Sequence, residues 1–530
     1  MDMTRIGVRL GVTLLALLGA ACASVAPSVD PFEDAASGSS TAAPSALPTD
    51  SATSPAPGTP IATSTATASP ARAPLPFPLD ATIPELQQAM EAGELTAVEL
   101  VDFYLDRIAA YDDAGPALNA FILVNPTALQ TATALDGERA NSGPRGMLHG
   151  IPLVIKDNLN TFDMPTTAGS TSLQGWEPGS DAFVVRKLRE AGAIILGKTN
   201  LPDFAGSWQT VSSLGGRTLH PYDLARDPGG SSGGTAVAVS ANLGVAGLGT
   251  DTCGSIRLPA ALNNLYGLRP SSGLTSRGGL IPLTLTLDAV GPMARSVADL
   301  AIMLDAMAGV DPDDPTTVAI RASYLASVSV DGLQGRRVGV DEDLRVTGDV
   351  GRLFDAALDE LAANGVELVN IDVPPPTADL PIFMEEHEAA LNQYFSKYPD
   401  PPKQVEPASP LDTASRRAAI EQREVFRIAV TDLMDEYRLD AIVYPGSRTL
   451  AGRIALGAGS EPVDCLRASL GGLPALVMPA GFGPGGLPVA IELMGRQFDE
   501  TTLIAMAAGW EAHTTYRMLP PTTPALDATD

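Results

Sequence analysis

A stretch rich in glycine and serine, residues 227–257, constrains this chain more than any other part of its sequence. The glycines between positions 229 and 234 let the backbone take turns that are closed to residues with a Cβ. We therefore expect Ser231, which they surround, to lie where two segments of the chain approach each other closely.

The residues after this loop predict a helix, a strand and a second loop. The Ala- and Val-rich run 235–243 is typical of a buried helix, which Gly244 would end. Residues 245–250 predict a short buried strand. The chain then turns at 251–254, and Ser255 follows where successive backbone N–H groups can point into one cavity. Such N–H groups can form an oxyanion hole.

A serine nucleophile needs a base, and histidine is the usual one. The histidines of this chain are scattered, and none has the context of a catalytic triad: His149, His220, His387 and His513. The stretch 150–158 instead carries an apolar strand directly into Lys156. Burial disfavours the charged form of a lysine and lowers its pKa, so we expect Lys156 to be the base.

Three motifs make the chain resemble the amidase signature family, which are serine hydrolases of amides with a Ser-Ser-Lys triad. The motifs are residues 150–158 around the lysine, 229–234 around the first serine and 249–257 around the second. Further shared motifs occur up to residue 489. The resemblance therefore covers nearly the whole body of the chain.

The resemblance implies a role for each matched residue. Ser255 would be the acyl-forming nucleophile, Ser231 a bridging serine that follows a cis peptide bond, and Lys156 the base. The oxyanion would be held by backbone N–H groups from Thr252, Cys253, Gly254 and Ser255. The family uses no metal and no cofactor. Cys253 stands where many members have glycine, and we expect it to narrow the acyl pocket without forbidding catalysis.

The order of predicted elements agrees with the fold that the resemblance implies. Strands at 121–124, 151–155 and 193–196 enclose a helix at 181–190, an alternation typical of βαβ units. We expect an α/β amidase signature fold over residues 79–530. It would be a single large domain with a central mixed, largely parallel β-sheet covered by helices on both faces.

Two helix starts are predicted near the beginning of this domain. Thr82 to Glu85 and Thr96 to Glu99 both have the Thr-x-x-Glu form of a capping box. Gly93 would end the first of these helices.

The N-terminal residues predict export. Residues 1–21 combine two arginines with an apolar run too short to span a membrane, which is the pattern of a signal peptide. Residues 19–22 resemble a bacterial lipobox, which would place a lipid anchor at Cys22; ordinary cleavage after Ala23 is the alternative. Residues 22–78 consist mainly of Ala, Ser, Thr and Pro, so we expect a disordered tether. The protein would be a membrane-anchored lipoprotein of the cell envelope, or otherwise periplasmic or secreted.

The charge of the chain excludes one class of partner. A net charge of −28 at pH 7 would repel the phosphates of nucleic acid. We therefore expect a small-molecule or peptide amide as the partner and no nucleic acid. The oligomeric state is not predicted.

Cys253 and Cys465 can be read in two ways. A secreted setting permits a disulfide between them. A chain of 530 residues needs no covalent link to be stable, so two buried free thiols are the simpler expectation.

Three other charged positions also allow a functional and a structural interpretation. Arg257 could bind a substrate carboxylate, but we expect an ion pair with Asp251 that braces the loop. Lys198 could be a second base, but no phosphate-loop spacing surrounds it, and we expect a structural or solvent-edge lysine. His387 lies among glutamates yet lacks a second histidine at helical spacing, so a solvated acidic helix face is expected there in place of a metal site.

The sequence as a whole predicts an exported amidase that hydrolyses a carboxamide to a carboxylate plus ammonia or an amine through an acyl-serine. Its character is most like the peptide-amidase branch of the family, which suggests a peptide C-terminal amide as substrate. One alternative is an amidase like the A-type subunit of glutamine-tRNA amidotransferase, which export and acidity oppose. Another is a non-catalytic solute-binding lipoprotein, which the complete triad opposes.

Overall fold

A computed structural model of the chain describes residues 77–320, 322–376, 383–398, 402, 413–457 and 459–526. The predicted signal peptide, Cys22 and almost all of the predicted tether lie outside these residues. All described residues belong to one compact unit. Within them, no helix has both the length and the apolar character needed to cross a membrane.

One large β-sheet organises this unit. Its strands, in their order across the sheet, are β1 (Phe121–Val124), β3 (Ile194–Thr199), β2 (Pro152–Lys156), β6 (Ala246–Asp251), β8 (Ala289–Ala294), β7 (Tyr266–Arg269), β12 (Ala475–Gly483), β13 (Leu487–Met494), β11 (Ala441–Pro445), β9 (Arg337–Asp341) and β10 (Glu367–Ile371). A separate two-stranded sheet pairs β4 (Val211–Ser212) with β5 (Gly216–Arg217).

The large sheet is mixed. Strands β3, β2 and β6 are parallel neighbours, as are β11, β9 and β10. Strand β1 joins β3 in the antiparallel sense, and every pairing from β6 through β8, β7, β12 and β13 to β11 is antiparallel as well. The α/β class and the mixed sheet are therefore confirmed. The βαβ alternation recognised in the sequence corresponds to the parallel group around β2.

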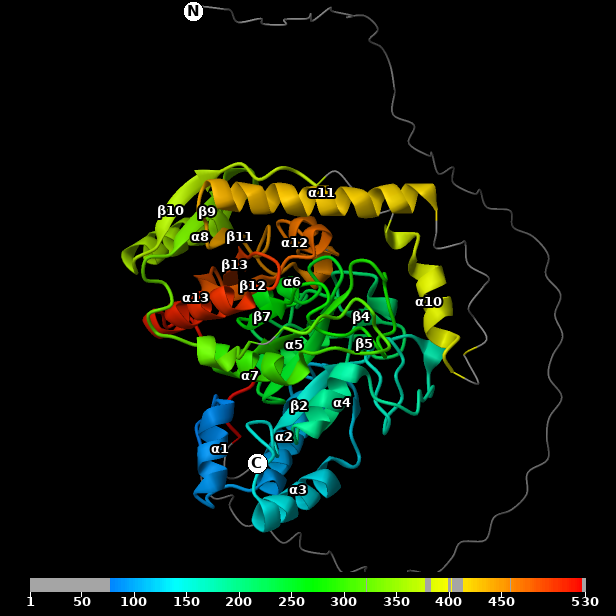
Figure 1. The fold of residues 1–530 in the computed structure, drawn as a ribbon. Helices are drawn as coiled ribbons and strands as arrows, with labels where there is room; N and C mark the ends of the chain where they lie inside the picture. The colour runs from blue at the N-terminus through cyan, green and yellow to red at the C-terminus, as the bar shows by residue number, and fades with distance from the viewer. Residues whose placement is uncertain are drawn as a thin grey trace, which may run out of the picture. The chain divides into compact units, whose positions relative to one another are not determined.

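The described residues also form α-helices. They are α1 (Ile83–Glu91), α2 (Ala97–Tyr111), α3 (Ala128–Ser142), α4 (Phe183–Glu190), α5 (Gly233–Ser240), α6 (Arg257–Leu262), α7 (Val297–Met307), α8 (Gly348–Ala363), α10 (His387–Phe395), α11 (Ala414–Glu436), α12 (Leu466–Gly471) and α13 (Glu500–His513). In Figure 1, α11 runs along one end of the body, and α1, α2 and α3 gather at the other. Helix α5 contacts β2 and β6, and α8 contacts β12 and β13.

Both predicted capping boxes are confirmed. The Thr82 side chain caps α1 and the Thr96 side chain caps α2, and in each case the glutamate three residues on returns a bond to the cap backbone. Gly93 follows the end of α1 with a positive φ of 73°. Short-range sequence signals therefore locate these helix ends correctly.

The Ala- and Val-rich helix is buried, as predicted, but it ends earlier than Gly244. Helix α5 closes at Ser240, and Asn242 takes the left-handed turn that follows, with φ 55°. Its small residues allow close packing on the sheet: a Cβ added to Gly247 of β6 would lie 2.6 Å from the Thr235 side chain. The helix that carries the serine-rich loop is thus seated directly on the sheet.

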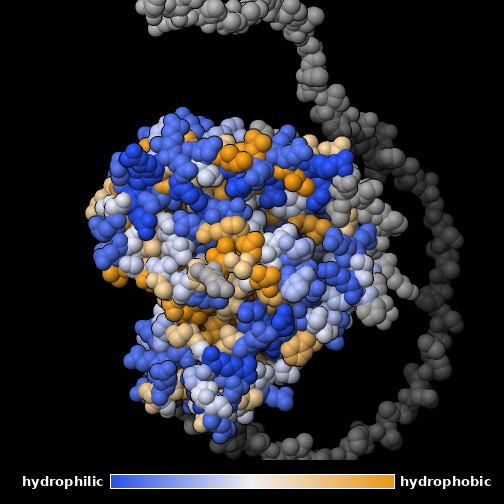
Figure 2. Space-filling view, viewed as in Figure 1, coloured by the Kyte–Doolittle hydropathy of each residue, from blue (hydrophilic) through white to orange (hydrophobic). Residues whose placement is uncertain are grey.

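The core and the surface divide by polarity. The main hydrophobic cluster surrounds the sheet and includes fully buried residues of β2, β6 and α5. The face drawn in Figure 2 is largely hydrophilic, with hydrophobic residues gathered near its middle. Strands β2 and β6 and helix α5 therefore form part of this main hydrophobic cluster.

Candidate active site

Three elements bring the predicted catalytic residues to one edge of the sheet. Lys156 is the last residue of β2, Ser255 follows β6, and Ser231 precedes α5. Strands β2 and β6 are parallel neighbours, so their carboxyl ends lie side by side. The helix packed on both strands holds the Ser231 loop over this edge.

Lys156 is fully buried and points at Ser231. Its Nζ donates to Ser231 Oγ at 2.7 Å and to Thr250 Oγ1 at 2.8 Å. Burial lowers the pKa of Lys156 to about 7, although the carboxylates of Asp288 and Asp251 act in the opposite direction. Near neutral pH a large share of Lys156 is therefore uncharged, and its lone pair can accept the Ser231 proton across the same short distance.

Ser231 and Ser255 lie in two loops that touch each other. The peptide bond between Gly230 and Ser231 is cis, which confirms what the resemblance implied. The backbone N–H of Ser232 donates to the Ser255 carbonyl at 3.1 Å. The loops therefore touch at Ser255 and at the residue that follows Ser231.

Asp251 shapes the loop that leads to Ser255. Its carboxylate accepts from the N–H groups of Gly254 at 3.0 Å and Ile256 at 3.1 Å. This corrects one of the predicted oxyanion donors, because the Gly254 N–H points back at Asp251. None of the N–H groups of Thr252, Cys253 and Ser255 is bonded to a backbone carbonyl of the described residues. These three amides remain the candidates for holding an oxyanion.

Hydrogen bonds to neighbouring side chains hold Thr252 and the Cys253 carbonyl. Thr252 donates its hydroxyl to Asp288, whose carboxylate also accepts from backbone N–H groups of Leu283 and Thr284. Burial raises the pKa of Asp288. Trp208 donates its Nε1–H to the Cys253 carbonyl at 2.8 Å. Thr252 therefore takes part through its side chain, in addition to the backbone role predicted for it.

Ser255 lines a cavity of about 350 Å³. Its other walls are formed by Ala205, Gly206, Ser207, Trp208, Thr252, Cys253, Leu283 and Met384. None of the described residues that line it is charged. The cavity is therefore suited to an uncharged and largely apolar group next to the nucleophile.

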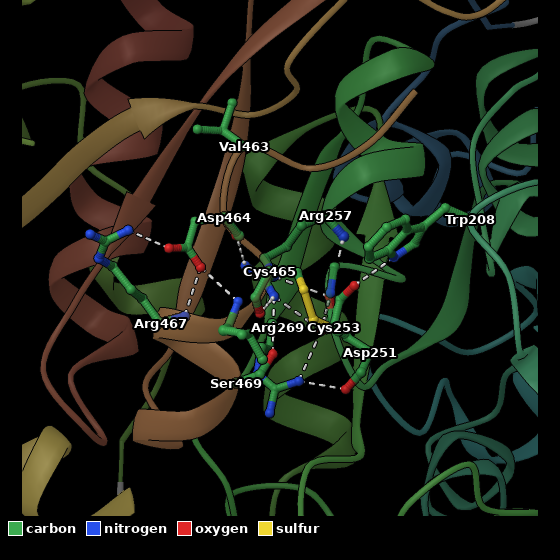
Figure 3. Close-up of a disulfide and its surroundings, with 12 residues drawn as sticks. Trp208, Asp251, Cys253, Arg257, Arg269, Val463, Asp464, Cys465, Arg467 and Ser469 are labelled. Atoms are coloured by element: carbon green, nitrogen blue, oxygen red, sulfur yellow. Dashed lines mark hydrogen bonds and ion pairs between the residues drawn. A yellow bond between two sulfur atoms is a disulfide. The ribbon is translucent and has the colours of Figure 1, made fainter. Parts of the chain in front are cut away.

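The structure corrects the expectation of free thiols, because Cys253 and Cys465 form a disulfide (Figure 3). The two residues are 212 positions apart in the sequence, and their Cα atoms are 4.5 Å apart. A chain of this size does not need a disulfide for overall stability, which was the reason for expecting free thiols. The disulfide instead joins two particular segments, the loop before Ser255 and the start of α12. Nothing in the local sequence of either cysteine revealed that the two lie together.

Arg257 braces the nucleophile loop, as predicted. It is fully buried, with its Nε 3.1 Å from an Asp251 carboxylate oxygen and its Nη1 2.7 Å from a Glu492 oxygen. Arg269 pairs with the other oxygen of Asp251 at 2.9 Å. Burial alone would raise the pKa of Asp251, but the two guanidinium groups hold it well below its usual range. A substrate carboxylate has no access to this arginine.

We expect Arg257→Ala to lower the free energy of unfolding by about 3–5 kcal/mol, because it leaves the buried Glu492 carboxylate without its cationic partner and Asp251 with Arg269 alone. Chemical denaturation measures this change. Arg186→Ala is the matched control, since its pair with Glu190 is about half exposed and should contribute about 0–1 kcal/mol. Equal effects of the two substitutions would contradict the brace.

The remaining ambiguous positions are structural. Lys198 is fully buried and lies 2.9 Å from Asp157, which confirms a structural lysine. The prediction of a solvated acidic face near His387 was wrong for Glu386. That residue is buried. Its carboxylate accepts a hydrogen bond from the Thr286 hydroxyl and pairs with Arg416 at 2.7 Å.

Backbone carbonyls engage the rings of three histidines. His149, His220 and His387 each place a ring nitrogen about 3 Å from a backbone carbonyl, those of Leu135, Leu262 and Leu283 respectively. Burial also lowers the pKa of His220 to about 4. The side chain that does reach a candidate hydroxyl is that of Lys156.

Some residues of the site were not recognised in the sequence. Thr250 Oγ1 accepts from both Lys156 and Asn158, at 2.8 and 3.1 Å, and so fixes the lysine. Thr250 and Asn158 lie inside recognised motifs and could have been proposed as polar neighbours of the lysine. Trp208 and Met384 carry no local signal, because they reach the cavity from segments that are separate in the sequence from the three motifs.

Comparisons with known proteins agree on one family. A model of the amidase family matches residues 99–410, which include Lys156, Ser231 and Ser255. In Roseiflexus castenholzii, the A-type subunit of glutamyl-tRNA(Gln) amidotransferase is 34% identical over 470 residues, which cover 81% of this chain and 95% of that protein.

Solved structures show the same likeness. The native peptide amidase from Stenotrophomonas maltophilia superposes with a TM-score of 0.77 at 37% identity, covering 84% of this chain and 99% of that one. The A-type subunit of glutamyl-tRNA(Gln) amidotransferase from Thermotoga maritima gives a TM-score of 0.69 at 30% identity, covering 84% and 99%. The likeness therefore extends over almost the whole length of each of these structures.

Proposed function

This chain belongs to the amidase family, and from that membership we propose that it is an exported amidase that cleaves a carboxamide through an acyl-serine intermediate. The observation that carries the proposal is the hydrogen bond of 2.7 Å between the fully buried Lys156 Nζ and Ser231 Oγ. It places a lysine of lowered pKa on a hydroxyl whose loop touches that of Ser255.

The reaction begins with proton transfer along this line of groups. Neutral Lys156 accepts the Ser231 proton, Ser231 accepts the proton of Ser255, and Ser255 Oγ attacks the carbonyl carbon of the amide. The amides of Thr252, Cys253 and Ser255 are the groups available to hold the oxyanion. The proton returns through Ser231 to the leaving nitrogen, so that ammonia or an amine departs as the C–N bond breaks.

Water completes the reaction by the same path. It gives a proton to the relay, attacks the acyl-serine carbonyl and releases the carboxylate, while Ser255 regains its proton. Each turnover consumes one amide and one water and yields one carboxylate and one ammonia or amine. The side chains and backbone amides named here supply every proton transfer and the stabilisation of the oxyanion.

The cavity supports a substrate class. Its described lining offers Trp208, Leu283 and Met384 and no charged side chain. Free glutamine would bring an ammonium and a carboxylate, which are costly to bury without charged partners. We propose an amide with an uncharged, apolar acyl part, such as the C-terminal amide of a peptide. The name of the peptide amidase neighbour is consistent with this choice.

Release of ammonia or amine from a panel of amides tests the proposal. The panel contains peptide C-terminal amides with apolar and with charged last residues, anilides, free glutamine and asparagine. We expect the highest kcat/KM for apolar peptide amides. Glutamine as the best substrate would favour the amidotransferase-like alternative, and no turnover of any amide would overturn the proposal.

Export and anchoring form a separate part of the proposal, supported by the sequence of residues 1–22. Fractionation of cells that express the full chain should place the protein in the envelope, with lipid label incorporated at Cys22. Cys22→Ser is the matched control and should lose the label. A wild-type protein that stays in the cytoplasm would contradict export.

Activity should rise with pH around the pKa of Lys156. Below about 7 the lysine is charged and cannot accept a proton, so kcat/KM should fall about tenfold for each further pH unit. Above this pKa it should reach a plateau. A pH–rate profile on one amide measures this, and a flat profile between about pH 5 and 9 would contradict a lysine base.

The same pKa shift makes the stability of the folded protein depend on pH. The folded pKa of Lys156 lies below the unfolded value of about 10.5, so the unfolded state binds more protons between the two values. Burial of this lysine therefore costs stability in full below pH 7, and the cost disappears as the pH rises towards 10.5. At neutral pH, other interactions of the fold must offset this cost of burying Lys156.

A further inference from the structure

The disulfide beside Ser255 holds the tip of a loop whose base is already secured. Asp251 and Arg257 are fully buried and paired, and Arg257 also donates to the Cys465 carbonyl at 3.0 Å. The start of the loop and the start of α6 are therefore fixed by ionic contacts. The disulfide adds a covalent tie at Cys253, between those two fixed ends.

Residue 253 is held at two separate atoms. Its Sγ is joined to Cys465, and its carbonyl oxygen accepts from Trp208 Nε1 at 2.8 Å. Figure 3 shows both attachments on the same loop, with Asp251 and Arg257 beside them. With its side chain and its carbonyl both attached, the Cα of this residue is held on two sides, which limits the directions that its N–H can take.

The segment that carries Cys465 also packs closely against the loop. A Cβ added to Gly254 would lie 3.1 Å from Pro462 Cγ and 3.6 Å from Cys465 Cβ, and Gly254 has a positive φ of 86°. The Gly254 N–H is turned onto Asp251. Two of the amides left for an oxyanion, those of Cys253 and Ser255, belong to the residues on either side of Gly254.

We propose that the Cys253–Cys465 disulfide is a positioning element of the active site, which keeps the Cys253 amide directed at the oxyanion. The inference rests on the proposed acyl-serine chemistry. Because the oxyanion exists only in the transition state and the intermediate, breaking the disulfide should lower kcat far more than it changes KM. A link that served stability alone would leave kcat of the folded protein unchanged.

A small dithiol can reach this bond, since Cys253 lines the cavity and Cys465 is partly exposed. Thiolate attack on one sulfur forms a mixed disulfide, and the second thiol of the reagent then displaces it. The dithiol becomes a cyclic disulfide, and Cys253 and Cys465 gain the two electrons and two protons as thiols. Removal of the reagent and addition of a disulfide oxidant reverses the exchange.

The test uses the full chain in a Cys22→Ser background, which leaves these two cysteines alone. Kinetics on the amide found in the panel are compared before reduction, after dithiol treatment and after reoxidation. We expect kcat to fall by about tenfold or more, a fraction of the about 10²–10³-fold for loss of an oxyanion donor. We expect KM to change by less than about threefold, and reoxidation to restore kcat.

Two variants separate positioning from stability. Cys253→Ala with Cys465→Ala should show the low kcat at once and no further response to dithiol. Trp208→Phe keeps the disulfide but removes the donor to the Cys253 carbonyl, and it should also lower kcat. Thermal unfolding of each sample confirms that the assay is run below its midpoint.

The outcomes separate this inference from the proposed function. A reduced enzyme or Trp208→Phe variant that is folded and retains the full kcat overturns the positioning role, even if the wild type cleaves amides normally. A wild type with no amide turnover, and no reaction of Ser255 with a fluorophosphonate, instead overturns the proposed function. Should the double variant fail to fold, reduction of the native protein and Trp208→Phe still decide the matter.

Discussion

Ser255→Ala should abolish amide turnover, with a loss in kcat of about 10⁴–10⁶-fold, as is usual when a cooperating nucleophile is removed. The substitution deletes one hydroxyl at the wall of the cavity and opens no large void, so the free energy of unfolding should change by less than about 1 kcal/mol. Steady-state kinetics and chemical denaturation on the same samples measure the two effects.

A covalent probe makes this prediction specific. A fluorophosphonate should label Ser255 in the wild type, and peptide mapping should find no label on the Ser255→Ala protein. Ser329→Ala, at an exposed serine, is the control and should keep both labelling and turnover. Labelling that persists at full rate in Ser255→Ala would show that another residue is the nucleophile.

Lys156→Ala should produce the second large loss. General base catalysis contributes about 10²–10⁴-fold, and a cooperating triad can lose more when one member is removed. The residual activity should also lose the rise around pH 7, because the group that titrates there is gone. Comparison of the pH–rate profiles of wild type and variant measures both effects.

Single replacements of His149, His220, His387 and His513 are the controls for this result. Three of these rings bond backbone carbonyls, and none is placed on a candidate serine among the described residues. Each replacement should leave the apparent pKa of the reaction in place. Retained turnover in Lys156→Ala together with a large loss in a histidine variant would overturn the lysine relay.

The sequence predicted most about the parts of the molecule that depend on short-range chemistry. Capping boxes at Thr82 and Thr96 located two helix starts, since a cap involves residues three positions apart. The buried brace of Arg257 followed from its place beside Asp251. Lys156 could be proposed as a base because an apolar strand led into it.

Long-range pairing was less accessible. The antiparallel strands in the middle of the sheet, β7, β8, β12 and β13, come from two parts of the chain, and no local pattern states that β12 lies beside β7. The disulfide had the same obstacle, because its cysteines are 212 positions apart. The direction of the Gly254 N–H depends on a loop conformation that the sequence leaves open.

The ribosome makes the catalytic residues of this chain long before it makes part of the structure that supports the Ser255 loop. Lys156, Ser231 and Ser255 are all made within the first half, but the partner that neutralises Arg257 on its second side is Glu492, in β13. Strands β12 and β13 lie between β7 and β11, so the sheet has a gap until residues 475–494 are made. A growing or prematurely terminated chain would therefore carry all three reactive side chains without the support that fixes their loop. Hydrolysis should accordingly begin only once synthesis is nearly complete.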